Sequence, residues 1–302
     1  MHDFTYYAQI LISGLTIGSL YALIAIGYTM VYGILRLINF AHGDMFMVAG
    51  FIMIYITSWR SGFLGAGSIA VGLILTLILT VVLGVMIEKV AYKPLRSAPR
   101  MSVMISAIGV SYLLQNLSTY VTGGLAQAYP NIPWLRTEIE IGGITVRRLA
   151  ILTPVLTILL VIALVIVIKH TKMGMAMRAV AKDFDTAQLM GIRIDRVISI
   201  TFVIGSFLAA VGSILYFSYI GQVSPTIGAM PGLKSFVAAV FGGIGSVPGA
   251  VIGSYIIGIC ETFIKSNQDI SIFSNAFTFA LLIIILLIKP NGLFGEKLKE
   301  KV

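Results

Sequence analysis

The chain has 302 residues, of which 58% are hydrophobic and 11% charged, and its mean hydropathy is +0.99. A soluble domain carries about twice that share of charged residues, so the composition excludes an ordinary soluble protein. The net charge of +9 is compatible with nucleic-acid binding. However, the basic residues lie in short loops beside apolar segments, which is typical of the cytoplasmic loops of a membrane protein, so we expect no nucleic-acid partner.

Long apolar segments recur along the chain and predict an all-α polytopic membrane protein. A helix needs about 20 mostly apolar residues to cross the hydrocarbon core of a bilayer. These segments occupy nearly the whole chain, so residues 1–302 are expected to form a single transmembrane domain. The eight predicted spans are residues 9–33, 45–58, 66–88, 101–121, 149–168, 197–217, 248–264 and 273–289.

The distribution of basic residues predicts which loops face the cytoplasm. Most of them lie in three segments, 89–100, 169–196 and 289–301, which are therefore expected to be cytoplasmic. Loop 122–148 lies between two of these segments, with one span on each side. Parity therefore places this loop outside.

Parity also requires the chain to cross where no regular helix is expected. Segment 218–247 must return across the membrane, although it contains Pro225, Pro231 and six glycines. Segment 34–44 would have to cross as well if the N-terminus is cytoplasmic, and the sequence leaves that side open. Two broken or half-membrane segments at matching positions are typical of transporters built from internal repeats, here about 1–148 and 149–302.

Three polar residues of the first broken segment are candidates for the pathway. Asn39, His42 and Asp44 are flanked by apolar runs. Polar and ionisable side chains at membrane depth are costly and usually face a cavity or a partner. We expect them to line the translocation path, where they would contact a polar solute or brace the broken backbone. The alternative is an interfacial turn in which Asp44 caps the helix that follows.

A glycine-rich stretch of the second broken segment is the next candidate. Gly242, Gly243 and Gly245 superficially suggest a phosphate-binding loop, but no Lys-Ser/Thr follows and no P-loop motif occurs elsewhere. We expect these glycines either to permit close helix packing or to form part of the pathway wall. Close packing is also expected at glycines spaced four residues apart, Gly14 with Gly18 and Gly249 with Gly253.

No metal site or catalytic set is recognisable in the sequence. Its three histidines, His2, His42 and His170, are scattered without the spacing of metal ligands. No Ser/His/Asp constellation is recognisable either, so an intramembrane enzyme is not expected.

The cytoplasmic segment 178–191 is predicted to be a short amphipathic helix. Ala181, Ala187 and Gly191 fall near one face at helical spacing, together with Phe184 and Gln188. A small, partly apolar helix in a cytoplasmic loop needs a protein partner or the membrane surface to cover it. The alternative is an ordinary interfacial helix without a protein partner.

Several motifs in this chain resemble known transporters. Asp185-Thr186-Ala187-x3-Gly191 is similar to the Glu-Ala-Ala-x3-Gly loop of ABC-transporter permeases, with Asp and Thr replacing Glu and the first Ala. More specific blocks cover nearly the whole chain and resemble the branched-chain amino acid permease family of the "H" type. These blocks are Gly27–Gly33, Ile38–Gly43, Glu88–Arg96, Ile105–Gly109, Thr201–Gly205 and Ala238–Gly249.

The resemblance implies an importer subunit in a bacterial or archaeal cytoplasmic membrane. It would form the path for branched-chain amino acids delivered by an extracytoplasmic binding protein, beside a second related permease and two ATP-binding subunits. ATP and Mg²⁺ would bind those subunits, so this chain would hold no cofactor and would not itself be an enzyme. The residues implied in ATPase coupling are Ala181, Asp185, Thr186, Ala187 and Gly191.

Other functions remain open from the sequence alone. Related permeases carry urea, short amides or sugars, and no residue decides among these solutes. An ion-coupled secondary transporter should show ionisable residues inside several spans, whereas only Asp44 and Glu261 come close here. A passive channel would need no coupling helix.

Overall fold

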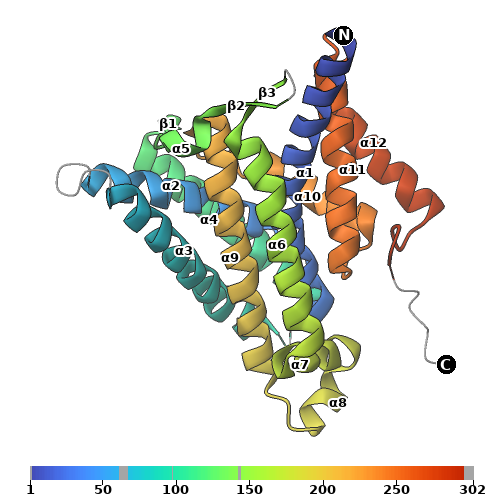
Figure 1. The fold of residues 1–302 in the computed structure, drawn as a ribbon. Helices are drawn as coiled ribbons and strands as arrows, with labels where there is room; N and C mark the ends of the chain where they lie inside the picture. Colours follow the sequence, from blue (N-terminus) through green and yellow to red (C-terminus); the bar gives the residue numbers. More distant parts are fainter. Residues whose placement is uncertain (1, 61–66, 97, 142–143, 296–302) are drawn as a thin grey trace.

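The computed structural model describes residues 2–60, 67–96, 98–141 and 144–295, most of them in helices (Figure 1). The helices are α1 (His2–Leu35), α2 (His42–Arg60), α3 (Gly67–Ile87), α4 (Arg100–Thr122), α5 (Pro133–Arg136), α6 (Arg148–His170), α7 (Lys172–Lys182), α8 (Phe184–Leu189), α9 (Ile194–Ile220), α10 (Ala229–Gly242), α11 (Val247–Ser266) and α12 (Ser274–Ile288). Three short helical turns join them: the π-helical η1 (Glu88–Tyr92) and the 3-10 turns η2 (Lys93–Leu95) and η3 (Ser271–Phe273).

Two small antiparallel sheets lie at one end of the bundle. Strand β2 (Glu138–Ile141) pairs with β3 (Ile144–Arg147), and Glu138 is opposite Arg147. Strand β1 (Gln127–Ala128) pairs with β4 (Gln222–Val223), which follows α9. Loop 122–148 therefore lies over the end of α9, on the face opposite α7 and α8 (Figure 1).

The prediction of a polytopic all-α protein is confirmed. Among the described residues, seven helices are long and apolar enough to cross a membrane. The eighth predicted span, 45–58, lies in the shorter helix α2. Segment 218–247 contains the 14-residue helix α10, too short for a full crossing, as the prolines and glycines predicted.

The N-terminus lies on the same face as loop 122–148. Helix α1 begins beside strand β3 and ends near α7 (Figure 1). The Tyr6 hydroxyl donates to the carbonyl of Ser266, the last residue of α11, at 3.1 Å. Segment 34–44 holds only the end of α1, a short connection and the first turn of α2. It is therefore not a crossing of its own, and parity is satisfied with an extracytoplasmic N-terminus.

The long helices pack in a reciprocal pattern. Helix α1 packs along α11, and α9 packs along α3. Helix α2 contacts α9 and α3, whereas α10 contacts α1 and α11. Each short helix is thus held between two long ones, and α1 and α9 contact each other at the centre.

The α1–α11 interface brings two backbones into direct contact. A Cβ atom placed on Gly258 would lie 2.3 Å from the backbone nitrogen of Gly18, and one on Gly14 would lie 2.9 Å from the Cα atom of Ile259. Gly249 and Gly253 likewise lie against the backbone of α10, at Gly242 and Ala238. The close packing predicted at these glycine pairs is therefore confirmed, because small residues allow such an approach.

Gly258→Ala should destabilise the protein by about 1–3 kcal/mol, because the added methyl group forces α1 and α11 apart. Gly109→Ala is the matched control, since its Cβ atom would meet nothing within 4 Å. Alanine has a higher helix propensity than glycine, so the control should be neutral or stabilising. Thermal unfolding in detergent measures both, and an equal shift for the two variants would contradict the interface.

Candidate functional site

Helix α1 ends and α2 begins within the fold, around a short non-helical connection. The amide of Arg36 donates to the carbonyl of Tyr32 at 2.7 Å, and Arg36 has a φ of 52°. The carbonyl of Asn39 accepts from the amide of His42 at 3.1 Å, which begins α2. Asn39 and His42 are both buried, as expected for polar groups inside a membrane protein.

The side-chain amide of Asn39 and the ring of His42 each have one nitrogen without a hydrogen-bond partner among the described residues. The Oδ1 atom of Asn39 accepts from the Tyr92 hydroxyl at 2.7 Å, whereas its Nδ2 atom has no hydrogen-bond partner among the described residues. The His42 ring stands edge-to-face on Tyr28 at 5.0 Å between centroids, and its Nε2 atom also lacks such a partner. Buried polar groups are normally paired, so the Nδ2 atom of Asn39 is a candidate for a ligand. The Nε2 atom of His42 lies against Gly27 of α1, where a Cβ atom would lie only 2.1 Å from it.

Asp44 has its partners within the protein. Its buried carboxylate accepts from the Ser111 hydroxyl at 2.5 Å and from Nε2 of Gln115 at 3.0 Å, both on α4. The carboxylate therefore ties α2 to α4 instead of capping α2. This geometry favours the bracing role among those that the sequence suggested for Asp44.

The N-terminal ends of α2 and α10 meet at a half-helix junction, formed by Tyr28, His42, Gly43, Gly228 and Gly232. A Cβ atom on Gly43 would lie 2.8 Å from the carbonyl oxygen of Gly228 and 3.0 Å from the Cα atom of Gly232. The Tyr28 hydroxyl lies beside both Gly43 and Gly232. Helix N-termini carry a partial positive charge, so the junction concentrates two of them at one place.

The glycine-rich stretch lies at the other end of α10. Gly242 lies against Gly249, and Gly243, with a φ of 110°, lies against Gly292 and Gly295. Gly245 has a φ of 97°, a backbone conformation that residues other than glycine rarely adopt. The structure therefore does not bring Gly242, Gly243 and Gly245 together with the residues of the first broken segment.

The C-terminal end of α10 is covered by the segment that follows α12. The amide of Leu293 donates to the carbonyl of Phe241 at 3.0 Å, and the amide of Phe294 donates to that of Gly242 at 2.9 Å. These bonds satisfy carbonyl groups that the end of a helix leaves unpaired. The packing interpretation of the glycine-rich stretch is the one that this geometry favours.

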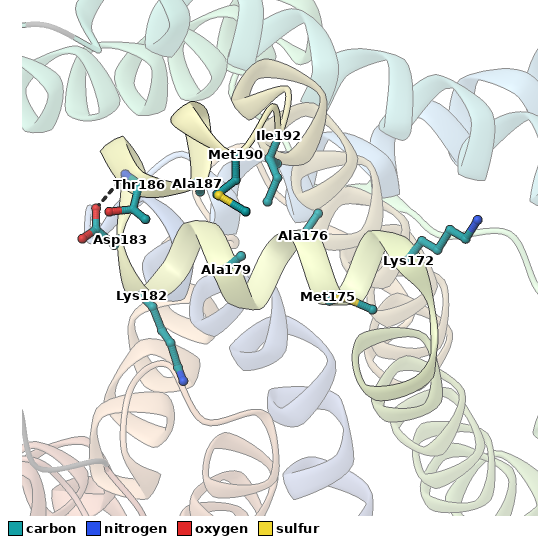
Figure 2. Close-up of a pocket in the computed structure, with 10 residues that line it drawn as sticks. All are labelled: Lys172, Met175, Ala176, Ala179, Lys182, Asp183, Thr186, Ala187, Met190 and Ile192. Carbon is teal, nitrogen blue, oxygen red and sulfur yellow. Dashed lines mark hydrogen bonds between the residues drawn. The ribbon is translucent and has the colours of Figure 1, made fainter.

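The cytoplasmic segment differs from its prediction, because two helices replace the single helix expected over 178–191. Asp183 has an extended backbone between α7 and α8, and its carboxylate accepts from the amide of Thr186 at 3.0 Å (Figure 2). Aspartate is a favoured N-cap, so it ends one helix and begins the next. The single amphipathic face predicted across 178–191 is therefore wrong.

The residues predicted to couple to the ATPase differ in their exposure to solvent. Ala187 is buried, whereas Asp185, Thr186 and Gly191 are exposed and Ala181 is partly exposed. Between α7 and α8 lies a groove of about 660 Å³, which reaches the surface and is lined mainly by small and apolar residues (Figure 2). Its lining includes Met175, Ala176, Ala179, Thr186, Ala187 and Met190.

The most exposed apolar side chains of this segment follow directly on the groove. Leu189 is 87% exposed and Met190 is 79% exposed. Sequence reasoning missed both, because it placed the contact face by the periodicity of one continuous helix. Exposed apolar side chains beside a groove mark a surface that a partner protein can cover.

A family model for the permease component of branched-chain amino acid transport systems matches residues 10–286. The chain belongs to this family.

Full-length relatives agree with the family model. The high-affinity branched-chain amino acid transport system permease protein LivH of Salmonella typhimurium is 41% identical over 316 residues, covering 99% of both chains. LivH of Escherichia coli is 41% identical over 306 residues with the same coverage. BraD of Pseudomonas aeruginosa, described in the same words, is 39% identical over 312 residues and covers both chains completely.

The family and the helices together locate this permease. It is a multi-pass protein of the cytoplasmic membrane, as the sequence predicted, and the family is one of transport subunits and not of enzymes.

The permease also contains a buried ionic cluster that sequence reasoning missed. Lys234 of α10 and Glu261 of α11 form an ion pair of 2.6 Å, and their side chains are 6% and 1% exposed. Glu261 also pairs with Lys265 at 2.6 Å and accepts from the Tyr21 hydroxyl at 2.9 Å. Lys234 is the one charged residue in segment 218–247 of the sequence, which was the signal that could have revealed the cluster.

Glu261→Gln should destabilise the permease by about 3–5 kcal/mol, because it leaves Lys234 buried without a counter-charge. Lys234→Met should cost less, since Lys265 and Tyr21 still satisfy the Glu261 carboxylate. Thermal unfolding of the two variants in detergent shows which of them loses more stability. Equal losses, or a larger loss for Lys234→Met, would contradict this account of the cluster.

Proposed function

We propose that this permease forms the translocation path for branched-chain amino acids in an importer driven by ATP-binding-cassette subunits. The observation that carries the proposal is the similarity to LivH and BraD over essentially the whole chain, since both names describe high-affinity branched-chain amino acid transport. The complex would contain a second homologous permease, two ATP-binding subunits and an extracytoplasmic solute-binding protein. ATP and Mg²⁺ would bind to the ATP-binding subunits.

The α7–α8 segment is the proposed coupling element. It lies on the face opposite loop 122–148 and carries the groove together with Leu189 and Met190 (Figure 1). An ATP-binding subunit would seat against Leu189, Met190, the exposed Asp185, Thr186 and Gly191, and the partly exposed Ala181. Ala187 would act from within, by packing α8 onto the bundle. Closure of the two ATP-binding subunits would then move the first turn of α9, which follows α8.

The half-helix junction is the proposed site of solute passage. A branched-chain amino acid has a carboxylate, which is favoured near helix N-termini, and an aliphatic side chain. The unpaired Nδ2 atom of Asn39 lies next to the start of α2 and would serve polar groups of the solute. The Nε2 atom of His42 would do so in states in which α1 no longer covers it at Gly27. Asp44 would hold α2 in place through α4. The tight contact of Gly43 with Gly228 and Gly232 would open in other states of the cycle.

The other candidate residues would support this movement. Gly242, Gly243 and Gly245 would keep the cytoplasmic end of α10 close to α11 and to segment 289–295. The reciprocal packing of the long helices supports two internal repeats, with α1–α4 in the first half (about 1–148) and α9–α12 in the second (about 149–302). The pseudo-symmetry would place α2 and α10 at equivalent positions, which explains why their N-termini meet.

Purification of the tagged permease from its native membrane should recover a second permease and ATP-binding subunits. Leu189→Glu should reduce recovery of the ATP-binding subunits at least tenfold, because a charge would be buried in the contact. Leu125→Glu is the matched control, since Leu125 is 69% exposed on the opposite face. Full recovery with Leu189→Glu, or an equal loss with Leu125→Glu, would contradict the coupling role of α8.

Gly232→Ala should slow leucine import at least tenfold, because its Cβ atom would lie 2.9 Å from the Cα atom of Gly43. Gly33→Ala is the control, since its nearest neighbour would lie at an ordinary 3.7 Å. Import of labelled leucine, urea and ribose into proteoliposomes containing the whole complex measures rate and solute class together. Import of urea or ribose in place of leucine would contradict the proposed solute, and unchanged leucine import by Gly232→Ala would contradict the junction.

A further inference from the structure

A π-helical turn separates α3 from the cytoplasmic face. This turn, η1, contains Glu88 and Tyr92, whose side chains are both buried. The carbonyl of Ala91 within the turn accepts from the Ser106 hydroxyl of α4 at 3.1 Å. π-Helical turns are rare and frequently lie at functional sites, and neither the pathway nor the coupling segment described above accounts for this one.

The first residue of η1 is tied to the beginning of α9. Glu88 forms an ion pair with Arg96, and its second oxygen accepts from the Ser199 hydroxyl at 3.0 Å. Arg96 also pairs with Asp195, which in turn pairs with Lys93 at 2.9 Å. Asp195 and Ser199 lie one turn apart on α9, so this helix holds η1 at Glu88 and the segment just after it at Lys93 and Arg96.

The two attachments differ in strength. Asp195 is 60% exposed, and exposed ion pairs contribute little by themselves. Glu88 is fully buried, and a buried charge that loses its partners is strongly destabilising. Arg96 and Ser199 must therefore stay with Glu88 when α9 moves, and η1 must follow them.

The side chain of Tyr92, the last residue of η1, reaches the connection that precedes α2. The Tyr92 ring packs on Phe202 of α9 at 5.4 Å between centroids, and its hydroxyl donates to Oδ1 of Asn39 at 2.7 Å. The backbone carbonyl of Asn39 accepts from the amide of His42, the first residue of α2, and closes the turn that leads into the helix. A shift of Tyr92 is thus a shift of the residue on which the first turn of α2 depends.

The connection between α1 and α2 is also strained. Arg36 is the one non-glycine residue with a positive φ in the described part of the chain, at 52°. Side chains with a Cβ atom adopt this conformation at a cost, which the surrounding contacts must offset. A small displacement of Asn39 therefore acts on a connection that already has a costly backbone conformation at Arg36.

We propose that Asp195, Ser199, Glu88, Arg96, Tyr92 and Asn39 form a relay that makes the opening of the half-helix junction depend on the position of α8. The proposal rests on the proposed function and extends it, because it assigns positioning roles to residues that, apart from Asn39, touch neither the solute nor the ATP-binding subunits. Movement of α8 shifts the first turns of α9, α9 carries η1 with it, and Tyr92 displaces Asn39 at the start of α2. These contacts form one continuous chain from the cytoplasmic face to the junction.

Two sets of substitutions interrupt the relay at opposite ends. Tyr92→Phe removes the hydrogen bond to Asn39 and keeps the ring on Phe202. Asp195→Asn with Ser199→Ala removes the polar attachments of α9 to the η1–η2 segment and leaves the Glu88–Arg96 pair intact. The readout is the number of ATP molecules hydrolysed per leucine imported by the reconstituted whole complex. If the residues had a purely structural role, the substitutions would lower the rates of ATP hydrolysis and leucine import together and leave this ratio unchanged.

Each set should raise the ratio at least fivefold while the ATP-binding subunits still co-purify in normal amount. Combining the two sets should raise it no further, because links in series fail together, whereas independent sites would add. Tyr129→Phe is the matched control, since the buried Tyr129 hydroxyl has no hydrogen-bond partner among the described residues. Asp269→Asn is the control for a surface charge, and both controls should keep the wild-type ratio.

Several results would contradict the relay. An unchanged ratio in either set, or an additive effect of the two, would overturn the relay. If the Tyr92→Phe complex does not assemble, the result for Asp195→Asn with Ser199→Ala decides by itself. If neither variant complex assembles, the residues form a purely structural network and the proposal is rejected. A wild-type complex that lacks ATP-binding subunits or does not import leucine would instead contradict the proposed function, and the relay would fall with it.

Discussion

Inside a bilayer every backbone amide and carbonyl must find a partner within the protein, and this constraint organises the broken helices α2 and α10. The first turn of α2 begins with the carbonyl of Asn39, and the last carbonyls of α10 accept from Leu293 and Phe294. Helix α11 then begins at Ser246, whose hydroxyl accepts from the amide of Gly249 at 3.3 Å. The beginnings of α2 and α11 therefore depend on polar groups of neighbouring residues, and the end of α10 depends on amides supplied by a distant segment.

The polar side chains within the bundle divide into two classes by their partners. Asp44 and Glu261 have their oxygens satisfied by neighbouring helices, so they hold the short helices α2 and α10 in place. Asn39 and His42 each keep a nitrogen without such a partner. Polar residues at membrane depth thus either fix a helix or keep a polar atom unpaired, and their hydrogen-bond partners distinguish the two cases.

Local features of the sequence predicted most of the spans, because a long apolar run has few alternatives to a membrane helix. The half-length of α10 was also predictable from Pro225, Pro231 and the glycines around them. The side of the membrane on which the N-terminus lies was not predictable. It depends on the connection between α1 and α2, and Tyr92, which anchors this connection at Asn39, lies far along the chain. The burial of Ala187 was missed because the Asp183 cap was read as part of a continuous helix, although aspartate at that place was a visible local signal.

The pairing of Leu293 and Phe294 with the end of α10 has a consequence for how the chain is made. Synthesis runs from the N-terminus, so α10 leaves the ribosome well before these two residues exist. Until they arrive, the carbonyls of Phe241 and Gly242 must be satisfied by water or by the insertion machinery. The second broken helix therefore reaches its final place only after translation has passed α12, and assembly of the complex must wait for that late step.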